Sequence, residues 1–250
     1  MDGFTKHRPS APTGFFAVEA AGLAWLADAG GARVARVLGV GADWLTVERV
    51  PSAPPTRAGA EAFGAALART HAAGAAGFGA GPDGWSGDGF IGDAPLSLRP
   101  AGTWGSFYAD QRVEPYALAA HRAGDLTDDD VKVIRRLCER LRRGDFDDDA
   151  GPARIHGDLW SGNLIWSPDG VVLIDPAAHG GHRVTDLAML ALFGAPHLAQ
   201  IVAGYQAEHG LPHGWRELIG LHQVHPLLVH AQLFGGGYGA RAAAAARQYL

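Results

Sequence analysis

Three side chains with the chemistry of phosphoryl transfer stand in a fixed order in the second half of the chain. Asp158 follows a His-Gly pair, Asn163 comes five residues later, and Asp175 follows after twelve more. A carboxylate can accept the proton of an attacking hydroxyl, while an amide and a second carboxylate supply the oxygen ligands that Mg²⁺ prefers. This order matches the kinase loop H-x-D-x-x-x-x-N followed by a metal-binding Asp. The spacing predicts Asp158 as a general base and Asn163 and Asp175 as magnesium ligands.

Short strands are predicted on both sides of this loop. Arg154 to His156 precede it and Leu164 to Trp166 follow it, and a Ser-Pro-Asp-Gly turn then leads into the apolar run Val171 to Ile174. The strands should bring Asp158 and Asp175 to one end of the unit. A single Asp or Asn in a loop commonly caps a turn. The complete set in its expected strand context favours the catalytic interpretation.

The segment Ile155 to Asn163, with the sequence IHGDLWSGN, resembles the fructosamine-3-kinase (ketosamine-3-kinase) family, and Trp160 is the discriminating residue. The resemblance covers nearly the whole chain and includes five further segments: Ile174 to Ala177, Thr185 to Leu190, Leu192 to Gly194, Phe90 to Gly92 and Thr103 to Tyr108. It implies an α+β, two-lobed protein-kinase-like fold of the aminoglycoside-phosphotransferase type. The lobes would be a truncated, small, β-rich nucleotide-binding N-lobe at 1–54 and a larger, mainly helical C-lobe at 55–250, which would carry catalysis and acceptor binding.

The resemblance also implies a reaction. It is the ATP- and Mg²⁺-dependent phosphorylation of the sugar 3-hydroxyl of a ketosamine (a fructosamine or ribulosamine), which is a sugar joined to an amine by glycation, as a step toward deglycation. The ketosamine would be a small molecule or bound to a protein. By the same analogy Asp186 would brace the catalytic loop, and His156 and Trp160 are further candidates beside it. Arg183 lies where an activation segment would lie and could approach a phosphate or an acidic acceptor.

The front of the chain offers a lysine and a glutamate at the spacing of a nucleotide-binding ion pair. Lys6 lies in the predicted strand Phe4 to His7, and Glu19 lies in the apolar helical pattern from Phe15 to Leu26. In kinases a strand lysine that contacts the phosphates is held by a glutamate on the next helix. The only other lysine is Lys132, so we expect Lys6 to contact the nucleotide. The alternative is an exposed lysine in a terminus.

Two more strands are predicted, at Val34 to Val40 and Trp44 to Val50. By resemblance the segment from Glu48 to Val50 is the hinge whose backbone would meet the adenine. A helix from Ala58 to His71 then begins the larger lobe. Family members begin with two further strands and a glycine-rich turn that cover the phosphates, whereas this sequence begins at Met1-Asp2-Gly3, which resembles a hairpin turn. The first hairpin is therefore expected to be missing.

Composition agrees with a globular enzyme. The chain has 250 residues, 47% of them hydrophobic, and a net charge of −5, which argues against a nucleic-acid surface. It shows no apolar run long enough for a membrane span and no signal peptide, so we expect a cytoplasmic protein. Cys138 follows the apolar rhythm of a helix predicted at 128–143 and is expected in the core. The sequence leaves monomer and homodimer open.

Other interpretations stay open at this stage. Another small-molecule kinase, for an aminoglycoside, choline or a sugar, would use the same catalytic residues. A pseudokinase or binding module would account for the missing hairpin. The glycine-rich segment 74–100 is expected to be an ordered loop rather than a calcium site, because the terminal Glu of an EF-hand is absent. Trp85, Phe90 and Trp104 are candidates to stack on a sugar, with packing as the alternative for each. His222, His225 and His230 are predicted to share one helix and to pack or contact the acceptor rather than bind metal.

Overall fold

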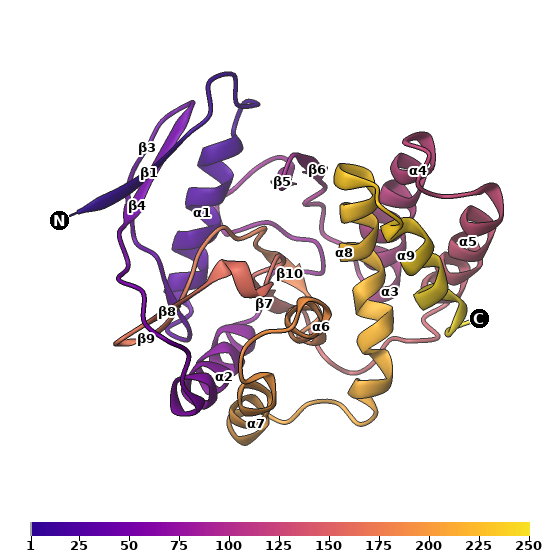
Figure 1. Ribbon diagram of the computed structural model, residues 1–250. Helices are drawn as coiled ribbons and strands as arrows, with labels where there is room; N and C mark the ends of the chain where they lie inside the picture. Colours follow the sequence, from indigo (N-terminus) through magenta and orange to yellow (C-terminus); the bar gives the residue numbers. More distant parts are fainter. Residues whose placement is uncertain (1) are drawn as a thin grey trace.

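The computed structural model describes residues 2–250. The chain starts with an antiparallel sheet of β1 (Gly3–His7), β4 (Trp44–Glu48) and β3 (Val37–Val40), in the order β1-β4-β3. Helix α1 (Phe15–Asp28) lies against this sheet and buries Leu23 and Leu26 (Figure 1). The predicted lysine strand and the helix after it are confirmed.

A second sheet joins the front of the chain to the predicted catalytic segment. The two-residue strand β2 (Arg33–Val34) runs parallel to β9 (Gly170–Leu173), which pairs with β8 (Leu164–Ser167) through the predicted turn. The single strand expected at Val34 to Val40 is therefore wrong. The segment forms two strands because Val34 pairs with β9, whereas β3 pairs with β4 in the other sheet. The strand that starts at Trp44 is correct but ends at Glu48, two residues earlier than expected.

Two corrections concern short segments. The turn expected at Met1-Asp2-Gly3 begins outside the described residues, and Gly3 itself lies in β1, opposite Glu48. The segment 74–100 contains a small hairpin, β5 (Gly89–Ile91) and β6 (Ala94–Leu96), where the sequence suggested only a loop. Three-residue strands bury too few side chains to produce a readable alternation.

Most of the remaining chain is helical. Helix α2 (Arg57–Ala72) crosses α7 (Leu198–Glu208) closely at glycines: a Cβ on Gly64 would lie 1.9 Å from the Ile201 carbonyl oxygen, and one on Gly204 would lie 2.0 Å from that of Glu61. The glycines allow the two backbones to touch. Between these helices in sequence lie strand β7 (Ala153–Ile155), strand β10 (His179–Gly181), which pairs with it, and helix α6 (Val184–Phe193).

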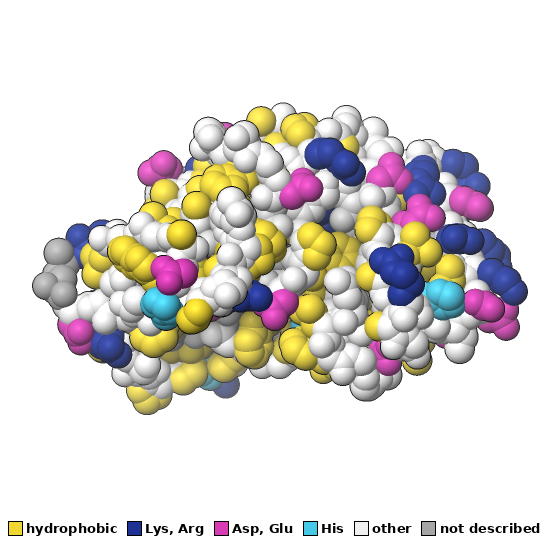
Figure 2. All heavy atoms as spheres, turned by 90° about the horizontal axis from the view of Figure 1, so that it is seen from above, with side chains coloured by type: hydrophobic (Ala, Val, Ile, Leu, Met, Phe, Trp, Pro, Cys, Tyr) yellow, Lys and Arg dark blue, Asp and Glu magenta, His cyan; other side chains and the backbone are white. Residues whose placement is uncertain are grey.

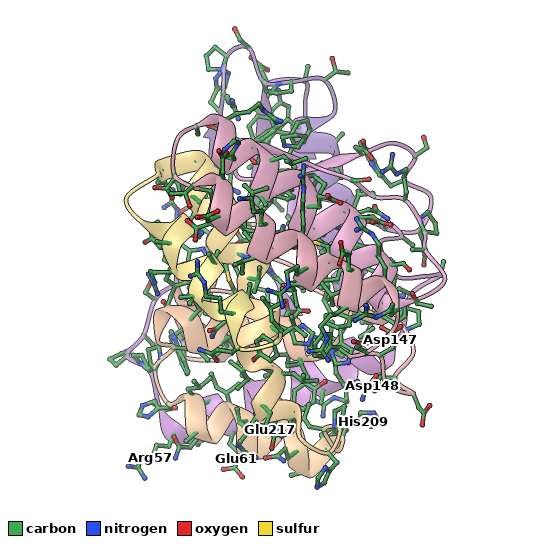
Figure 3. The ribbon with its side chains drawn as sticks, turned by 90° about the vertical axis from the view of Figure 1, so that its right-hand side faces the viewer. Arg57, Glu61, Asp147, Asp148, His209 and Glu217 are labelled. Carbon is green, nitrogen blue, oxygen red and sulfur yellow. The ribbon has the colours of Figure 1, made fainter. Side chains whose placement is uncertain are left out.

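A bundle of helices completes the molecule. Its members are α3 (Trp104–Phe107), the π-helix η1 (Tyr108–Val113), α4 (Glu114–Arg122), α5 (Asp128–Arg142), the 3₁₀ turn η3 (Trp215–Leu218), α8 (Ile219–Phe234) and α9 (Tyr238–Arg247). Figure 3 shows α4, α5 and α9 side by side on one face. Helix α5 begins as predicted, with a capping box between Thr127 and Asp130.

Two apolar cores hold these layers. One surrounds α1, α2 and the β8–β9 pair and includes Leu26, Leu67 and Val172, and the other lies within the helical bundle. Cys138 is buried in the second core, as predicted, and burial raises the pKa of its thiol to about 12. None of the helices within residues 2–250 has the length and apolarity needed to cross a membrane. The lobe boundary near residue 54 stays a prediction.

Candidate active site

The loop that carries Asp158 leaves β7 through a tight turn. Gly157 has a φ of 80°, and a Cβ there would lie 2.2 Å from the Ala177 carbonyl oxygen, so glycine is required on both counts. The chain then forms the 3₁₀ turn η2 (Ser161–Asn163) and enters β8. The Asn163 amide nitrogen donates to the Asp158 carbonyl oxygen at 2.8 Å and to its carboxylate at 3.2 Å. The two predicted residues are therefore in direct contact.

Asp186, on the first turn of α6, holds this loop from behind. Its carboxylate accepts the backbone N–H groups of His156 at 2.8 Å and Gly157 at 3.0 Å. It also lies 3.1 Å from the Nε2 atom of His71, and both side chains are fully buried. Burial acts to raise the pKa of Asp186, but the hydrogen bond and charge of His71 hold it below its ordinary value. An ionised acceptor thus fixes the backbone that presents Asp158.

The His156 ring supports the loop rather than facing the cleft. Its Nε2 atom donates to the Ile174 carbonyl oxygen at 2.9 Å, and its Nδ1 atom accepts the N–H of Asp158 at 3.2 Å. Burial lowers the pKa of His156, which agrees with a neutral ring that donates from one nitrogen and accepts at the other. The bond to Ile174 ties the loop to the end of β9, where Asp175 follows.

Asp158 is a carboxylate in a poorly solvated position. Burial raises its pKa to about 6, the hydrogen bond from Asn163 acts in the opposite direction, and the negative charge of Asp175 adds to the rise. A carboxylate with this pKa is a stronger base than an exposed one and is still ionised at neutral pH. The arrangement is suited to removing a proton from an alcohol.

Lys6 bridges the two halves of the site. Its Nζ atom lies 2.5 Å from the Glu19 carboxylate on α1 and 2.5 Å from the Asp175 carboxylate. Burial acts to lower the pKa of Lys6, but the charges of Glu19 and Asp175 raise it overall. Asp175 adopts a φ of 55°, a left-handed conformation that non-glycine residues adopt at sites where the surrounding structure imposes it.

Two cavities meet at this ion pair. The first, called the loop-side cavity, has a volume of about 360 Å³ and is lined by Asp158, Trp160 and Asn163 together with apolar side chains of α1 and the β5–β6 hairpin. The second, called the sheet-side cavity, has a volume of about 350 Å³. Lys6 and Asp175 line both cavities. The remaining walls of the sheet-side cavity are Phe4, Val47, Glu48, Arg49, Val50, Ile165 and Ile174.

The structure brings most of the predicted site residues together. Glu48 and Val50 line the sheet-side cavity, and Trp160 lines the loop-side cavity with 41% of its surface exposed. Arg183 is outside both linings, and its Nε atom is buried without a partner. The reason is local: Arg183 follows β10, which is buried against β7, and begins α6.

Apart from Phe90, sequence reasoning missed the apolar wall of the loop-side cavity. Phe15 and Val18 reach it from α1, and Phe90, Leu96 and Leu98 reach it from the hairpin region. Their apolar character was visible, but no spacing rule indicated that segments far apart in sequence would share one wall. The hairpin is also attached to the front of the chain, because the rings of Phe15 and Phe90 lie 5.1 Å apart.

The aromatic and histidine candidates divide between core and cleft. Trp104 is buried and stacks on Tyr108, so it is not available to stack on a sugar. His222 and His225 are buried in α8, as packing residues would be. Across residues 2–250 the structure contains no group of three or more His, Cys, Asp or Glu side chains suited to a metal ion. A magnesium ion held by one amide, one carboxylate and a nucleotide would not form such a group.

Comparison with known proteins finds relatives along the whole chain. The family model for fructosamine kinase matches residues 2–250. The "Probable ketoamine kinase" of Thermus thermophilus is 33% identical over 228 residues, which span 91% of this chain and 79% of the relative. The crystal structure of a Thermobifida fusca protein described as a fructosamine-3-kinase candidate is 47% identical, with a TM-score of 0.91, and the match covers 98% of this chain and 84% of that chain.

A more distant likeness concerns the fold alone. The gentamicin–APH(2'')-IIa complex has a TM-score of 0.56 at 13% identity, with 98% of this chain and 84% of that chain covered. Together with the mixture of small sheets and helices, it confirms the predicted α+β, two-lobed, protein-kinase-like fold.

Proposed function

The chain belongs to the fructosamine kinase family, and from this premise we propose that it transfers the terminal phosphoryl group of ATP to the 3-hydroxyl of a ketosamine. Family membership makes the chain a kinase that acts on sugar-amines. The sugar hydroxyl, the donor and the contribution to deglycation are the parts that we propose. The product, a ketosamine 3-phosphate, would be a step toward removal of the sugar from its amine.

The observation that carries the proposal is the junction of two cavities at one ion pair. Lys6 and Asp175 line both, and Asp158 lines only the loop-side cavity. Phosphoryl transfer needs a donor and an acceptor that approach each other in line at a point of concentrated charge. We therefore assign the sheet-side cavity to the nucleotide and the loop-side cavity to the ketosamine, with Asp158 beside the acceptor hydroxyl.

The nucleotide assignment has support from the walls of the sheet-side cavity. Val47, Ile165 and Ile174 give it apolar faces suited to a flat base, and the residues from Glu48 to Val50 also line it. We propose that this backbone pairs with the adenine edge. Lys6 would then reach the phosphates with its direction set by Glu19.

The donor set around Asp175 suits magnesium. The Asp175 carboxylate is partly exposed in the cleft, and Asn163 uses its amide nitrogen for Asp158, which leaves its amide oxygen as the atom available to a cation. Both are hard oxygen ligands, the type that Mg²⁺ takes beside nucleotide phosphates. When bound, the ion would neutralise charge on the phosphate oxygens.

On the acceptor side, the oxygen of the sugar 3-hydroxyl attacks the terminal phosphoryl group of ATP, and Asp158 receives the hydroxyl proton. Its raised pKa keeps it basic, and the loop braced by Asp186 keeps it in position. Trp160 lies at the same cavity and offers a flat face for the sugar ring. The apolar wall that includes Phe15 and Phe90 excludes water from the site of the attacking hydroxyl.

The test is magnesium-dependent ATP consumption with fructosyl-lysine or ribulosyl-lysine as the acceptor, with phosphorus NMR to locate the new phosphate. The expected product carries phosphate on O3 of the sugar. Turnover of an aminoglycoside, choline or a simple sugar, with neither ketosamine accepted, would overturn the acceptor assignment and retain the kinase. ATP binding without turnover of any acceptor would instead favour a binding role.

A further inference from the structure

A row of aromatic rings leads from the loop-side cavity onto the surface of the helical bundle. We call it the aromatic strip; its members are Trp160, Phe193, His230, Phe234 and Tyr238. Trp160 lies 6.3 Å from Phe193, and Phe193 lies 4.8 Å from His230. The His230 ring lies 5.5 Å from Phe234 and 5.1 Å from Tyr238. The rings come from four separate elements: the catalytic loop, α6, α8 and α9.

The two ends of the strip are unusually exposed for aromatic side chains. Trp160 is 41% exposed and Phe234 is 71% exposed. Phe234 ends α8 and is followed by three glycines, Gly235 to Gly237, all with positive φ. Because these glycines turn the chain back without side chains of their own, Tyr238 reaches His230 while Phe234 stays uncovered. Exposed aromatic surface of this kind is typical of binding sites.

The strip is continuous with the mouth of the loop-side cavity. Trp160 belongs to both. Gly92, at the tip of the β5–β6 hairpin, also lines the cavity, and a Cβ there would lie 3.2 Å from Leu233, the residue before Phe234. Figure 1 shows the C-terminal end of α8 beside this hairpin. The C-terminal end of α8, where Phe234 lies, is therefore next to a residue that lines the cavity.

The strip carries little charge. Burial lowers the pKa of His230, whose Nδ1 atom donates to the Pro226 carbonyl oxygen, so its ring is neutral. Two charged groups lie at its Tyr238 end: the Arg241 guanidinium is 5.3 Å from the Tyr238 ring centre, and the Asp125 carboxylate accepts the backbone N–H groups of Gly237 and Gly239. Figure 2 shows the upper face of the molecule, where charged side chains are most numerous toward α4 and α5 and hydrophobic side chains stand among scattered charges elsewhere. The strip therefore suits an apolar occupant.

From this continuity we infer that the aromatic strip binds the part of the acceptor beyond the glycated amine, and that this part is a peptide with aromatic or aliphatic side chains next to the glycated lysine. The inference rests on the proposed function and specifies its substrate class. A sugar fills only the cavity. Three ring-to-ring steps of 4.8 to 6.3 Å extend beyond it, a path as long as at most about five residues of extended peptide at ~3.3 Å each.

The experiment compares two acceptors that differ only beside the glycated lysine: acetyl-Phe-Lys(fructosyl)-Phe-amide and acetyl-Gly-Lys(fructosyl)-Gly-amide. The wild-type chain should prefer the phenylalanine peptide by about tenfold in kcat/KM, through KM rather than kcat, the scale of one or two buried aromatic contacts. Phe234→Ala should abolish the preference by raising KM for the phenylalanine peptide to that of the glycine peptide. Phe234→Tyr should retain it. Leu250→Ala, a matched truncation of an exposed apolar residue at the C-terminus, should also retain it.

The outcomes separate this inference from the proposed function. Equal kcat/KM for the two peptides, or a preference that Phe234→Ala leaves intact, would overturn the strip while turnover still supports a ketosamine kinase. Failure of both peptides together with free fructosyl-lysine would overturn the proposed function itself. A preference carried by Phe234 and expressed in KM establishes the strip as a specificity-determining surface.

Discussion

At the scale of single residues, the site combines a buried carboxylate with a shared cation. Asp158 is held in a position where ionisation costs free energy, whereas Lys6 is held where its charge is compensated twice, by Glu19 and Asp175. Burial disfavours the charged form of Asp158, which has no cationic partner. The charged form of Lys6 is favoured in spite of burial, because two carboxylates compensate it. Activity should therefore depend on each residue in a different way.

For Asp158 we expect a pH-dependent loss of activity. A base must be unprotonated, and its pKa of about 6 means that kcat/KM should fall about tenfold per pH unit below about pH 6. Asp158→Asn should lower kcat by about 10²- to 10⁴-fold without lowering the melting temperature, because the side chain stays isosteric and a costly buried charge is removed. A pH–rate profile and a thermal melt check this.

The control for that profile is the residual activity of Asp158→Asn. The pH–rate profile of this variant should lack the loss of activity below about pH 6, since the titrating carboxylate is gone. If the Asp158→Asn variant kept the same loss, the ionisation would belong to ATP or to another residue.

For the ion pair we expect Glu19→Gln to weaken nucleotide use. Lys6 would keep its contact with Asp175 but lose the carboxylate that sets its direction from α1. KM for ATP should rise by about tenfold, the effect of roughly 1.4 kcal/mol. Steady-state kinetics at varied ATP measure it. Glu61→Gln, the same change at an exposed position on α2 (Figure 3), is the matched control. Equal KM values in the two variants would contradict the role of Glu19.

At the scale of elements, the position of the site depends on how closely helices and strands approach. Asp186 reaches the loop that carries Asp158 because α6 begins directly behind it, and α2 brings His71 to the same carboxylate. Helix α2 is in turn seated on α7 through glycine contacts. Packing at a distance from the cleft therefore supports the loop.

We expect Gly64→Ala to destabilise the fold. Alanine usually favours a helix over glycine by about 1 kcal/mol, but here its Cβ would lie 1.9 Å from the Ile201 carbonyl oxygen, so the helices must separate. Overpacking of this kind costs about 1–3 kcal/mol. Urea unfolding measures the loss. Gly210→Ala is the control, because its Cβ would meet nothing within 4 Å, and a similar loss there would show that the α2–α7 contact is not the cause.

At the scale of the whole molecule, buried histidines make stability depend on pH. His156, His179, His222 and His225 are fully buried, and burial lowers the pKa of each, that of His179 to about 3. Below the unfolded value of about 6.5 the unfolded chain therefore binds protons that the folded chain does not, so stability falls as pH falls. Asp158 and Glu19, whose pKa values are raised, act in the opposite direction.

The four histidines outnumber the two carboxylates, so we expect a lower melting temperature at pH 5 than at pH 7.5. Each buried histidine contributes a slope of up to about 1.4 kcal/mol per pH unit below its unfolded pKa. Thermal melts across this range measure the slope. His225→Leu should make it shallower, whereas His209→Gln, at an exposed position (Figure 3), should not change it. Equal slopes in all three proteins would contradict the assignment.

Much of the site was readable from short stretches of sequence. The order of Asp158, Asn163 and Asp175 indicates the chemistry because a loop, a turn and two strands bring these residues together locally, within eighteen positions. Helix boundaries were equally readable where caps are strong, as at Thr127 on α5. The family followed from the same local signature, with Trp160 as its most specific residue. Local geometry is determined by the residues themselves, so a sequence pattern is sufficient.

Only the tertiary structure determined which residues from distant parts of the sequence contact each other. Lys6 contacts Asp175, which is 169 positions away in the sequence. Strand β2 pairs with the distant β9 rather than with β3, and Arg183 lies outside both cavities. The apolar wall of the loop-side cavity and the aromatic strip likewise combine residues from distant elements. Such contacts depend on the packing of whole helices and sheets, which no window of sequence contains. The local sequence therefore determines the order and spacing of the site residues, whereas the two cavities and the aromatic strip form only when distant elements pack.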